Sequence, residues 1–402
     1  MKILMVNKFL YPNGGSETYI FKVGGELQRL GHEVQYFGME HERRMVGNQA
    51  GSYTSNMDFH TGKLQKIFYP FKIIYSVEAR KKIRLVLDEF QPDAVHLNNF
   101  NFQLTPSILY EIRKYERQSA HPVRIVYTAH DSQLVCPNHL MQNPVTGERC
   151  RQCLKAGPWG CMKNKCIHGS RVKSMLGAIE GMLYKRLKTY SKIDAVICPS
   201  RFMKETLDTD SLLREKTVVL HNFVDKPEIN GDGKGNFILY FGRYSIEKGI
   251  DTLVKVCQTL PDIPFRFAGS GPMEEKVRTC ENIKMLGFLS GQELYETVAK
   301  ARFTVFPSEC YENCPFSVME SLACATPVIG SDLGGIPELI EENVTGELFE
   351  SGNGEELRRK IKALWEDGQR LERYTQACRE AHFDTLEEYC GKLLKLYKKD
   401  MR

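Results

Sequence analysis

The chain has 402 residues, of which 42% are hydrophobic and 26% charged, a composition typical of a globular protein with enough apolar material for two cores. No apolar run approaches the roughly 20 residues that a membrane-spanning helix needs. The short apolar start ends at Lys8 and does not have the form of a secretory signal. We therefore expect a cytoplasmic protein that touches, at most, the inner face of a membrane as a peripheral protein.

The net charge of +5 is unevenly distributed along the chain. Residues 1–200 hold 28 Lys and Arg against 16 Asp and Glu, a balance of +12 (28 − 16), whereas the rest holds 27 against 34, a balance of −7. A basic first half indicates an anionic partner. Nucleic acid is not expected, because the chain has no helix-turn-helix, zinc-finger or RNP signature. An anionic membrane surface or a phosphate-bearing substrate fits better.

The first half predicts a parallel α/β domain over residues 1–224. It opens with an apolar strand at 2–7, followed by a glycine pair, an amphipathic helix that ends near residue 30, and a strand at 33–37. This β-loop-α-β order is the unit of a parallel sheet. Further strands are expected at 94–97, 123–129, 195–198 and 218–220, with helices between them.

A turn-rich linker at 225–236 leads into a second β/α series, which predicts a domain over 225–383. Its strands are expected at 237–241, 264–268, 284–286, 303–306 and 328–330, with helices after Gly249, Pro272, Ser290 and Pro315. We predict an α/β fold of two doubly wound Rossmann-like domains that face each other across a cleft. The segment 384–402 should form a helix that packs back on the N-terminal domain. Ligands of such sheets bind at the carboxyl ends of the strands.

The stretch 303–333 carries the strongest chemical pattern. A buried strand ends at Phe306, a loop carries Glu312, Pro315 is placed in the first helical turn, and Glu320 lies one turn further on. Free amides at a helix N-terminus favour an anion, here a phosphate. These amides belong to Phe316, Ser317 and Val318. Carboxylates accept hydrogen bonds from hydroxyls, so the combination predicts a nucleotide-sugar site; the alternative is an amphipathic helix with two solvated glutamates.

Two cations, Arg243 and Lys248, follow the first strand of the second domain. Cations at this place can bind a diphosphate and stabilise the charge that develops on it as a leaving group, although two surface cations would give the same pattern. Gly269-Ser-Gly271 also follows a strand but lacks the third glycine of the dinucleotide fingerprint. Gly14-Gly15 would allow close backbone approach to a bound group, or would form a plain tight turn.

Together these motifs resemble the retaining GT-B glycosyltransferases of family 4, and the resemblance covers nearly the whole chain. Its markers are Gly14-Gly15-Ser-Glu17, Gly31-His-Glu-Val34, Gly242-Arg243, Glu247-Lys-Gly249, Gly269-Ser-Gly-Pro272, the E-x7-E pair Glu312 and Glu320, and Gly334-Gly-Ile-Pro-Glu338. One departure is Ala325, where the family usually has glycine. If that residue is left-handed, alanine costs up to about 1–2 kcal/mol, unless the helix ends differently here.

The resemblance implies roles for individual residues. Glu312 would contact hydroxyls of the donor sugar and Glu320 the ribose, while Arg243 and Lys248 hold the diphosphate. Further donor-binding residues would be Gly14, Gly15, Gly287, Phe288, Pro315, Phe316, Ser317 and Val318, with Gly287 and Phe288 beside the base. His130 matches the active-site histidine of the N-terminal domain, or is a structural histidine at a strand end.

The implied activity is transfer of a hexosyl or N-acetylhexosaminyl group from a UDP- or GDP-sugar to a saccharide or lipid-linked acceptor, as in bacterial surface-polysaccharide assembly. The mechanism would be front-face, with retention and without a catalytic metal or other required cofactor. Asp208-Thr-Asp210 has the spacing of a metal motif, but we interpret it as a solvated loop. The alternatives are a non-catalytic nucleotide-sugar-binding or scaffold protein, an inverting GT-B enzyme or epimerase, and a Rossmann oxidoreductase.

Five of the 13 cysteines lie in an insertion at about 132–170. Four of them, Cys150, Cys153, Cys161 and Cys166, could bind a structural Zn²⁺, with Cys136, His139 and His168 as substitutes. Reduced free thiols and disulfides are the alternatives.

Two stretches suit an anionic bilayer. Residues 151–192 contain ten Lys and Arg and one acidic residue, Glu180, while residues 63–84 contain seven Lys and Arg among aromatic and aliphatic side chains. A solvated basic face is the alternative.

Overall fold

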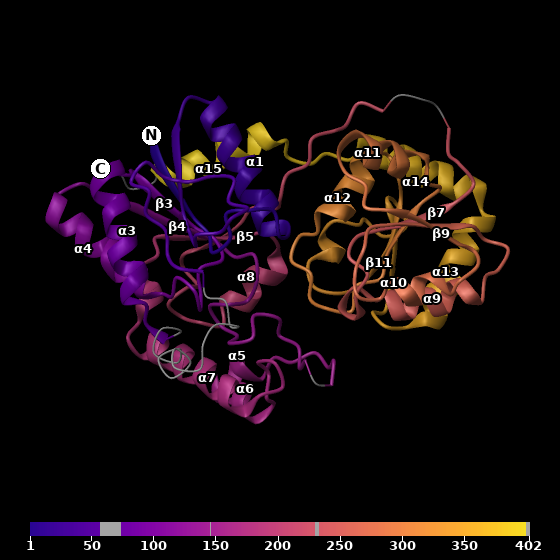
Figure 1. The fold of residues 1–402 in the computed structure, drawn as a ribbon. Helices are drawn as coiled ribbons and strands as arrows, with labels where there is room; N and C mark the ends of the chain where they lie inside the picture. Colours follow the sequence, from indigo (N-terminus) through magenta and orange to yellow (C-terminus); the bar gives the residue numbers. More distant parts are fainter. Residues whose placement is uncertain (57–73, 145, 230–232, 399–402) are drawn as a thin grey trace. The chain divides into compact units, whose positions relative to one another are not determined.

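The computed structural model describes residues 1–56, 74–144, 146–229 and 233–398 (Figure 1). It divides into two compact units, the first formed by Met1–Leu220 with Leu386–Arg402 and the second by His221–Thr385. We had expected boundaries after residues 224 and 383. Each unit contains one six-stranded sheet in which all neighbouring strands are parallel, which confirms the predicted α/β class.

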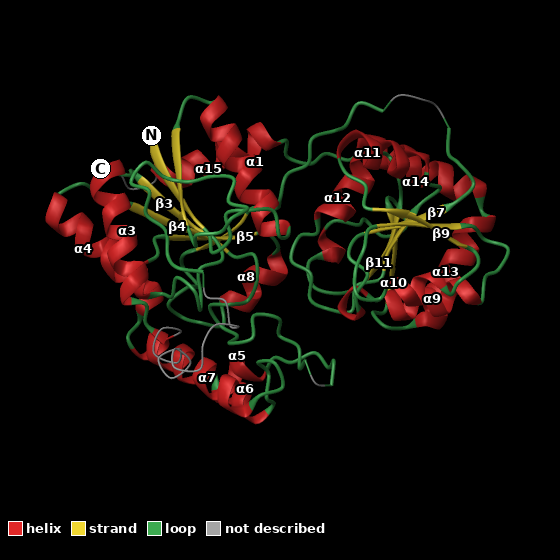
Figure 2. Ribbon diagram, viewed as in Figure 1, coloured by secondary structure: helices red, strands yellow, loops and turns green. Residues whose placement is uncertain are grey.

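Unit 1 has the strand order β2-β1-β3-β4-β5-β6. Its strands are short and, apart from the edge strand β6, almost wholly buried, as expected for a parallel sheet that is covered on both faces (Figure 2). Its elements are β1 Lys2–Val6, α1 Gly15–Arg29, β2 Glu33–Phe37, α3 Val77–Phe90, β3 Ala94–Leu97, α4 Ser107–Ser119, β4 Arg124–Thr128, α5 Gln152–Ala156, α6 Trp159–Lys163, α7 Arg171–Arg186, η2 Thr189–Lys192, β5 Ala195–Cys198, α8 Arg201–Leu207, β6 Thr217–Val219 and α15 Leu386–Lys398.

The last helix, α15, belongs to unit 1, as predicted. It packs against α1 and β4 and buries two tyrosines. The hydroxyl of Tyr389 lies 2.8 Å from that of Tyr19, and the hydroxyl of Tyr397 lies 2.6 Å from Nδ1 of His96. Buried hydroxyls need such partners, so these contacts fix the position of α15 on the unit.

Unit 2 has the strand order β12-β11-β10-β7-β8-β9. In Figure 1 its sheet lies between one layer that contains α11, α12 and α14 and another that contains α9, α10 and α13. The edge strand β12 was not predicted, because its sequence Gly-Glu-Leu-Phe begins with a glycine and a glutamate and is not a continuous apolar run. The elements are β7 Ile238–Phe241, η3 Ile246–Lys248, α9 Ile250–Gln258, β8 Phe265–Ala268, α10 Glu274–Arg278, β9 Ile283–Gly287, α11 Gly291–Lys300, β10 Thr304–Phe306, α12 Phe316–Ala323, β11 Val328–Ser331, η4 Ile336–Glu338, β12 Gly346–Phe349, α13 Gly354–Glu366 and α14 Gly368–Glu380.

None of the helices in the described ranges combines the length and the apolar character needed to cross a membrane.

Helix α12 ends in a Schellman motif. The amide of Thr326 donates to the carbonyl of Ser321 at 3.0 Å, and the amide of Ala325 donates to that of Leu322 at 3.0 Å. Ala325 has a φ of 52°, in the left-handed region that favours glycine. The helix therefore ends in the backbone geometry that is typical of glycine, although the residue at this position is alanine.

Replacing Ala325 by glycine should stabilise the protein. Glycine removes the left-handed strain of the Cβ, partly offset by greater freedom of the unfolded chain, so we expect the free energy of unfolding to rise by about 0.5–1 kcal/mol. Denaturant titration of the Ala325→Gly variant measures this change. A lower midpoint than the parent's would show that the alanine side chain makes a compensating contact.

Glu180 on α7 is a buried acid in unit 1. Only 3% of the residue is exposed, and its Oε1 has no hydrogen-bond partner in the described structure. Burial raises the pKa of this carboxyl to about 8, so the group is mostly protonated in the fold at neutral pH. The unfolded chain ionises it near its ordinary value of 4.5. The folded state therefore binds the extra proton between these two values, and stability is lost as the pH rises through that window.

The Glu180→Gln variant tests this linkage. Glutamine resembles the protonated acid but does not titrate, so the variant should match the parent at pH 4.5 and exceed its free energy of unfolding by about 2–4 kcal/mol at pH 8. Chemical denaturation at a series of pH values gives both curves. Parallel curves would contradict the assignment.

Candidate functional site

Five loops of unit 2 follow the carboxyl ends of β7, β8, β9, β10 and β11 and therefore meet at one edge of the sheet. The loops pack against each other through glycine backbone. A Cβ on Gly269 would lie 2.0 Å from the carbonyl oxygen of Gly242, and one on Gly271 would lie 2.4 Å from that of Tyr244. The Gly-x-Gly of this stretch thus serves close loop packing, which the sequence alone did not reveal.

Lys248 and Glu312 form the central contact of this edge. Nζ of Lys248 lies 2.5 Å from Oε1 of Glu312, which also accepts a 2.7 Å hydrogen bond from the hydroxyl of Ser308. Burial disfavours the charged amine, but attraction to Glu312 outweighs it, so the pKa of Lys248 lies above its ordinary value. Lys248 at the end of η3 and Glu312 after β10 were predicted as separate site residues, and the structure shows that they form an ion pair. Ser308 was missed, since nothing in the sequence distinguishes it from another loop serine.

Backbone contacts hold this pair in place. The carbonyl oxygen of Glu247 accepts from the amides of Glu309 and Cys310 at 3.0 and 3.1 Å, which ties η3 to the loop after β10. Gly249 has a φ of 71°, and a Cβ there would lie 1.8 Å from the carbonyl oxygen of Pro307. Gly334 has a φ of 64°, and a Cβ there would lie 2.3 Å from the carbonyl oxygen of Glu312. Glycine is required at both positions.

Helix α12 begins shortly after Glu312 in the sequence. Its first residue is Phe316, and Pro315 is the N-cap with an extended ψ of 122°. The prediction that Pro315 lies inside the first helical turn was therefore wrong by one position, since its ψ is not helical. The N-cap provides no side-chain hydrogen bond, so the amides of Phe316, Ser317 and Val318 remain available to an anion.

The remaining predicted donor residues of unit 2 lie on or beside the same loops. Arg243 is exposed directly after β7, and Phe288 is 79% exposed after β9, which ends at Gly287 with a φ of 73°. Glu320 is partly buried on α12, where its charge contributes to raising the pKa of Tyr295 on α11, although burial of the tyrosine is the larger cause. An exposed phenylalanine at a strand's carboxyl end offers a flat surface for a base.

In unit 1, His130 follows β4 and is held by Asn98, which follows β3. Its Nε2 lies 2.8 Å from Oδ1 of Asn98, whose amide nitrogen faces the carbonyl oxygens of Val6 and His96. Nε2 therefore carries the ring proton, and Nδ1 is an acceptor. Burial lowers the pKa of His130 to about 4, while Asp131 opposes this effect, so the ring is neutral at pH 7.

The two glycines at the start of α1 are not demanded by the chain's own packing. Gly14 has an extended φ of 177°. A Cβ on Gly15 would meet nothing within 4 Å. Space beyond Gly15 is thus open, as expected if a bound group approaches its backbone.

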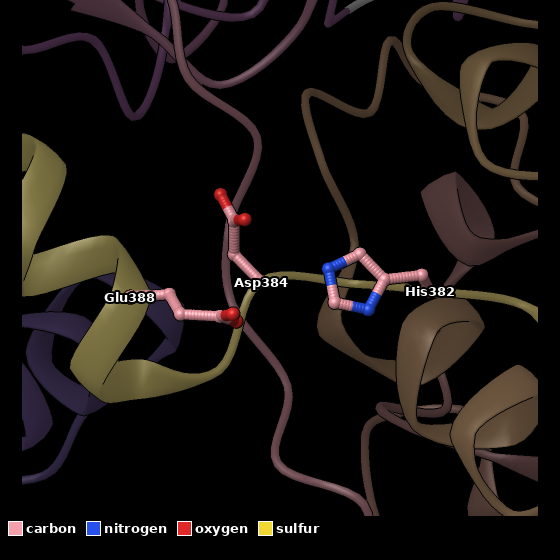
Figure 3. Close-up of side chains that lie close together, drawn as sticks. All are labelled: His382, Asp384 and Glu388. Carbon is pink, nitrogen blue, oxygen red and sulfur yellow. The ribbon is translucent and has the colours of Figure 1, made fainter.

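The candidate metal motif Asp208-Thr-Asp210 is structural. Asp208 accepts from Lys204 at 2.7 Å and from Thr217 at 2.6 Å, and Asp210 accepts from the amide of Leu212 at 2.9 Å. Asp210 is also buried, so the prediction of a solvated loop was wrong in that respect. Figure 3 draws another set of metal-ligand types, His382, Asp384 and Glu388. The first two belong to unit 2 and Glu388 to unit 1, and we assign no site to them.

Comparison with known proteins gives two family matches. The family described as Glycosyltransferase Family 4 matches residues 13–226, and the one described as Glycosyl transferases group 1 matches residues 223–381. An uncharacterized glycosyltransferase of Methanocaldococcus jannaschii is 30% identical over 226 residues, which are 52% of this chain and 63% of that protein. One subunit of the human phosphatidylinositol N-acetylglucosaminyltransferase is 24% identical over 361 residues, 85% of this chain and 64% of that protein. The chain thus spans less than two thirds of the length of these relatives.

Two solved structures share the fold over nearly their whole length. Sucrose-phosphate synthase from Thermosynechococcus elongatus aligns with a TM-score of 0.70 at 16% identity, over 99% of this chain and 98% of that one. HepE of Anabaena, solved in complex with UDP, aligns with a TM-score of 0.65 at 16% identity, over 98% and 100%. These likenesses agree with the two parallel sheets and with the predicted GT-B fold. The family match over residues 13–226, more than half of the chain, shows that the chain belongs to glycosyltransferase family 4.

Proposed function

We propose that this chain is a retaining glycosyltransferase that moves a hexosyl or N-acetylhexosaminyl group from a UDP- or GDP-sugar to a hydroxyl of a saccharide or lipid-linked acceptor. The observation that carries the proposal is the Lys248–Glu312 pair at the carboxyl edge of the second sheet, next in the chain to the uncapped start of α12. Cation, carboxylate and free amides together suit a diphosphate joined to a sugar.

The ion pair suggests how the donor binds. In the described structure, Glu312 neutralises Lys248 at 2.5 Å. A donor diphosphate would give Lys248 a second anion and would release Oε1 of Glu312 to accept hydrogen bonds from sugar hydroxyls. Arg243 and the amides of α12 would share the charge that develops on the leaving diphosphate, where such donors are most effective. The UDP complex of HepE supports a nucleoside diphosphate as the leaving group.

His130 would act in unit 1 as a neutral hydrogen-bonding group. Its Nδ1 can accept from a hydroxyl, because Asn98 fixes the ring proton on Nε2. We assign the acceptor proton to the leaving phosphate, in a front-face step with retention that uses no catalytic metal. An anomeric-proton NMR spectrum of the product separates retention from the inverting alternative.

A nucleotide-release screen across UDP-, GDP- and ADP-sugars tests the donor site. Lys248→Met and Glu312→Gln should each lower kcat/KM by about 100-fold or more, since each removes a group that contacts the reacting diphosphate or sugar. Lys255→Met is the matched control, because Lys255 is an exposed cation on α9 whose side chain is 67% exposed. Unchanged turnover in both site variants would refute the assignment. Binding of a nucleoside diphosphate without release from any sugar would favour the non-catalytic alternative.

We also propose that unit 1 binds an anionic membrane that carries the acceptor. Helix α7 exposes Val172, Met175 and Ile179 to 63%, 39% and 37%, at the spacing of one helical face. Arg171 and Lys173 are exposed at its start, and such a combination of apolar and cationic side chains is typical of interfacial helices. Of the second predicted stretch, residues 63–73 lie outside the described residues.

Sedimentation with vesicles tests this proposal. The protein should sediment with vesicles that contain phosphatidylserine but not with neutral ones, and 0.5 M salt should weaken binding, at about 1 kcal/mol per contributing cation. A Val172→Ser/Ile179→Ser variant should bind less, while Val344→Ser in unit 2 serves as control. Equal sedimentation with both vesicle types would contradict it.

A further inference from the structure

The insertion of unit 1 folds so that its five cysteines line one small cavity. These are Cys136, Cys150, Cys153, Cys161 and Cys166, and the other lining residues are Asn138, Met141, Gln142, Arg151 and Leu154. The chain therefore brings together residues that lie up to thirty positions apart in the sequence. All five cysteines are free thiols, without a disulfide.

Short local elements create the cavity. Helices α5 and α6 have five residues each and are joined by a turn in which Gly157 has a φ of 77°. Gly160 on α6 faces Sγ of Cys153, at 3.7 Å from the position a Cβ would take. The amide of Cys166 donates to the carbonyl of Cys161 at 3.1 Å, which returns the chain to the same place. Little regular structure holds this segment, so a cross-link at its centre would stabilise it.

Burial distinguishes the five thiols. Cys136, Cys161 and Cys166 are buried, whereas Cys150 and Cys153 are partly exposed. Cys153 packs against α6, because its Sγ lies 3.7 Å from the position that a Cβ on Gly160 would take. The structure therefore favours Cys136 over Cys150, which the sequence spacing had favoured.

Arg151, the one cationic side chain among the described residues that line the cavity, stacks on the ring of Phe202, with its guanidinium carbon 5.4 Å from the ring centroid. Burial raises the pKa of Cys136 to about 12 and that of Cys153 to about 11. Without a bound metal ion these groups stay protonated, and the sulfur of Cys136 donates to Oδ1 of Asn138 at 2.9 Å. A divalent ion with affinity for sulfur would reverse this preference, because it binds the thiolate form.

We propose that this cavity is a structural zinc site, with Cys136, Cys153, Cys161 and Cys166 as the four ligands. Tetrahedral thiolates at a Zn–S distance of about 2.3 Å lie about 3.8 Å apart. No three of the five sulfurs, all in the described part of the chain, lie within 4.8 Å of one another. Binding therefore draws the side chains together by rotamer changes, and it orders the insertion around the ion.

The full chain tests this directly. Protein purified without added metal, or loaded with Zn²⁺ after chelation, should hold one zinc per chain by elemental analysis. Loading at pH 7.5 should release about four protons per zinc, because the thiols are protonated beforehand. Co²⁺ in place of zinc should give the intense visible bands of a tetrahedral thiolate complex. Absence of stoichiometric zinc, or a disulfide among these cysteines in the mass spectrum, would overturn the site.

Single serine variants identify the ligands. Cys136→Ser, Cys153→Ser, Cys161→Ser and Cys166→Ser should each lower zinc affinity at least tenfold in a competition titration with a chelator. Cys150→Ser and, in unit 2, Cys280→Ser should keep it. Where a variant is too unstable to purify, the Co²⁺ spectrum of the parent still counts the thiolates. Loss of zinc in Cys150→Ser with retention in Cys136→Ser would overturn the assignment of Cys136.

Discussion

The close approach of loop backbones at the carboxyl edge of the second sheet is the constraint on which the candidate donor site depends. Gly249 and Gly334 each lie where a Cβ would overlap a carbonyl oxygen, of Pro307 in one case and of Glu312 in the other. Both also have positive φ values. The loop that carries Glu312 is thus held from two sides, by the segment after η3 and by the segment after β11. These backbone contacts place the loop that carries Glu312 next to the segment that ends at Lys248.

The close packing of these loops also determines the charge state of Lys248. A lysine that is largely withdrawn from water would lose its charge more easily, but Glu312 at 2.5 Å keeps it charged. Under the proposed function, a donor diphosphate would offer Lys248 an anion comparable to a carboxylate, whereas a neutral sugar would not. The pair would then favour the phosphate part of a donor and leave recognition of the sugar to hydrogen bonds.

Much of the fold could be predicted from the sequence, because parallel strands are continuous apolar runs and Ile238–Phe241 and Ala195–Cys198 are fully buried as their composition implies. The edge strand Gly346–Phe349 could not, since its sequence begins with a glycine and a glutamate and gives no such apolar run. For the site, residue types at strand ends indicated the chemistry. The contact between Lys248 and Glu312 and the role of Ser308 depend on loop packing across about sixty residues of chain, which local patterns do not encode.

The glycines also show what the sequence alone does not distinguish. In the sequence, Gly15, Gly249 and Gly334 look alike, each as a marker of the family. The structure separates them: the last two are required by internal packing, whereas a Cβ on Gly15 would meet no protein atom within 4 Å. Gly25 and Gly391 also have open space beside them and no positive φ. The sequence position of Gly15, at the first turn of a helix that follows the first strand of the sheet, is what distinguishes it from those two, and the open space there leaves room for a ligand.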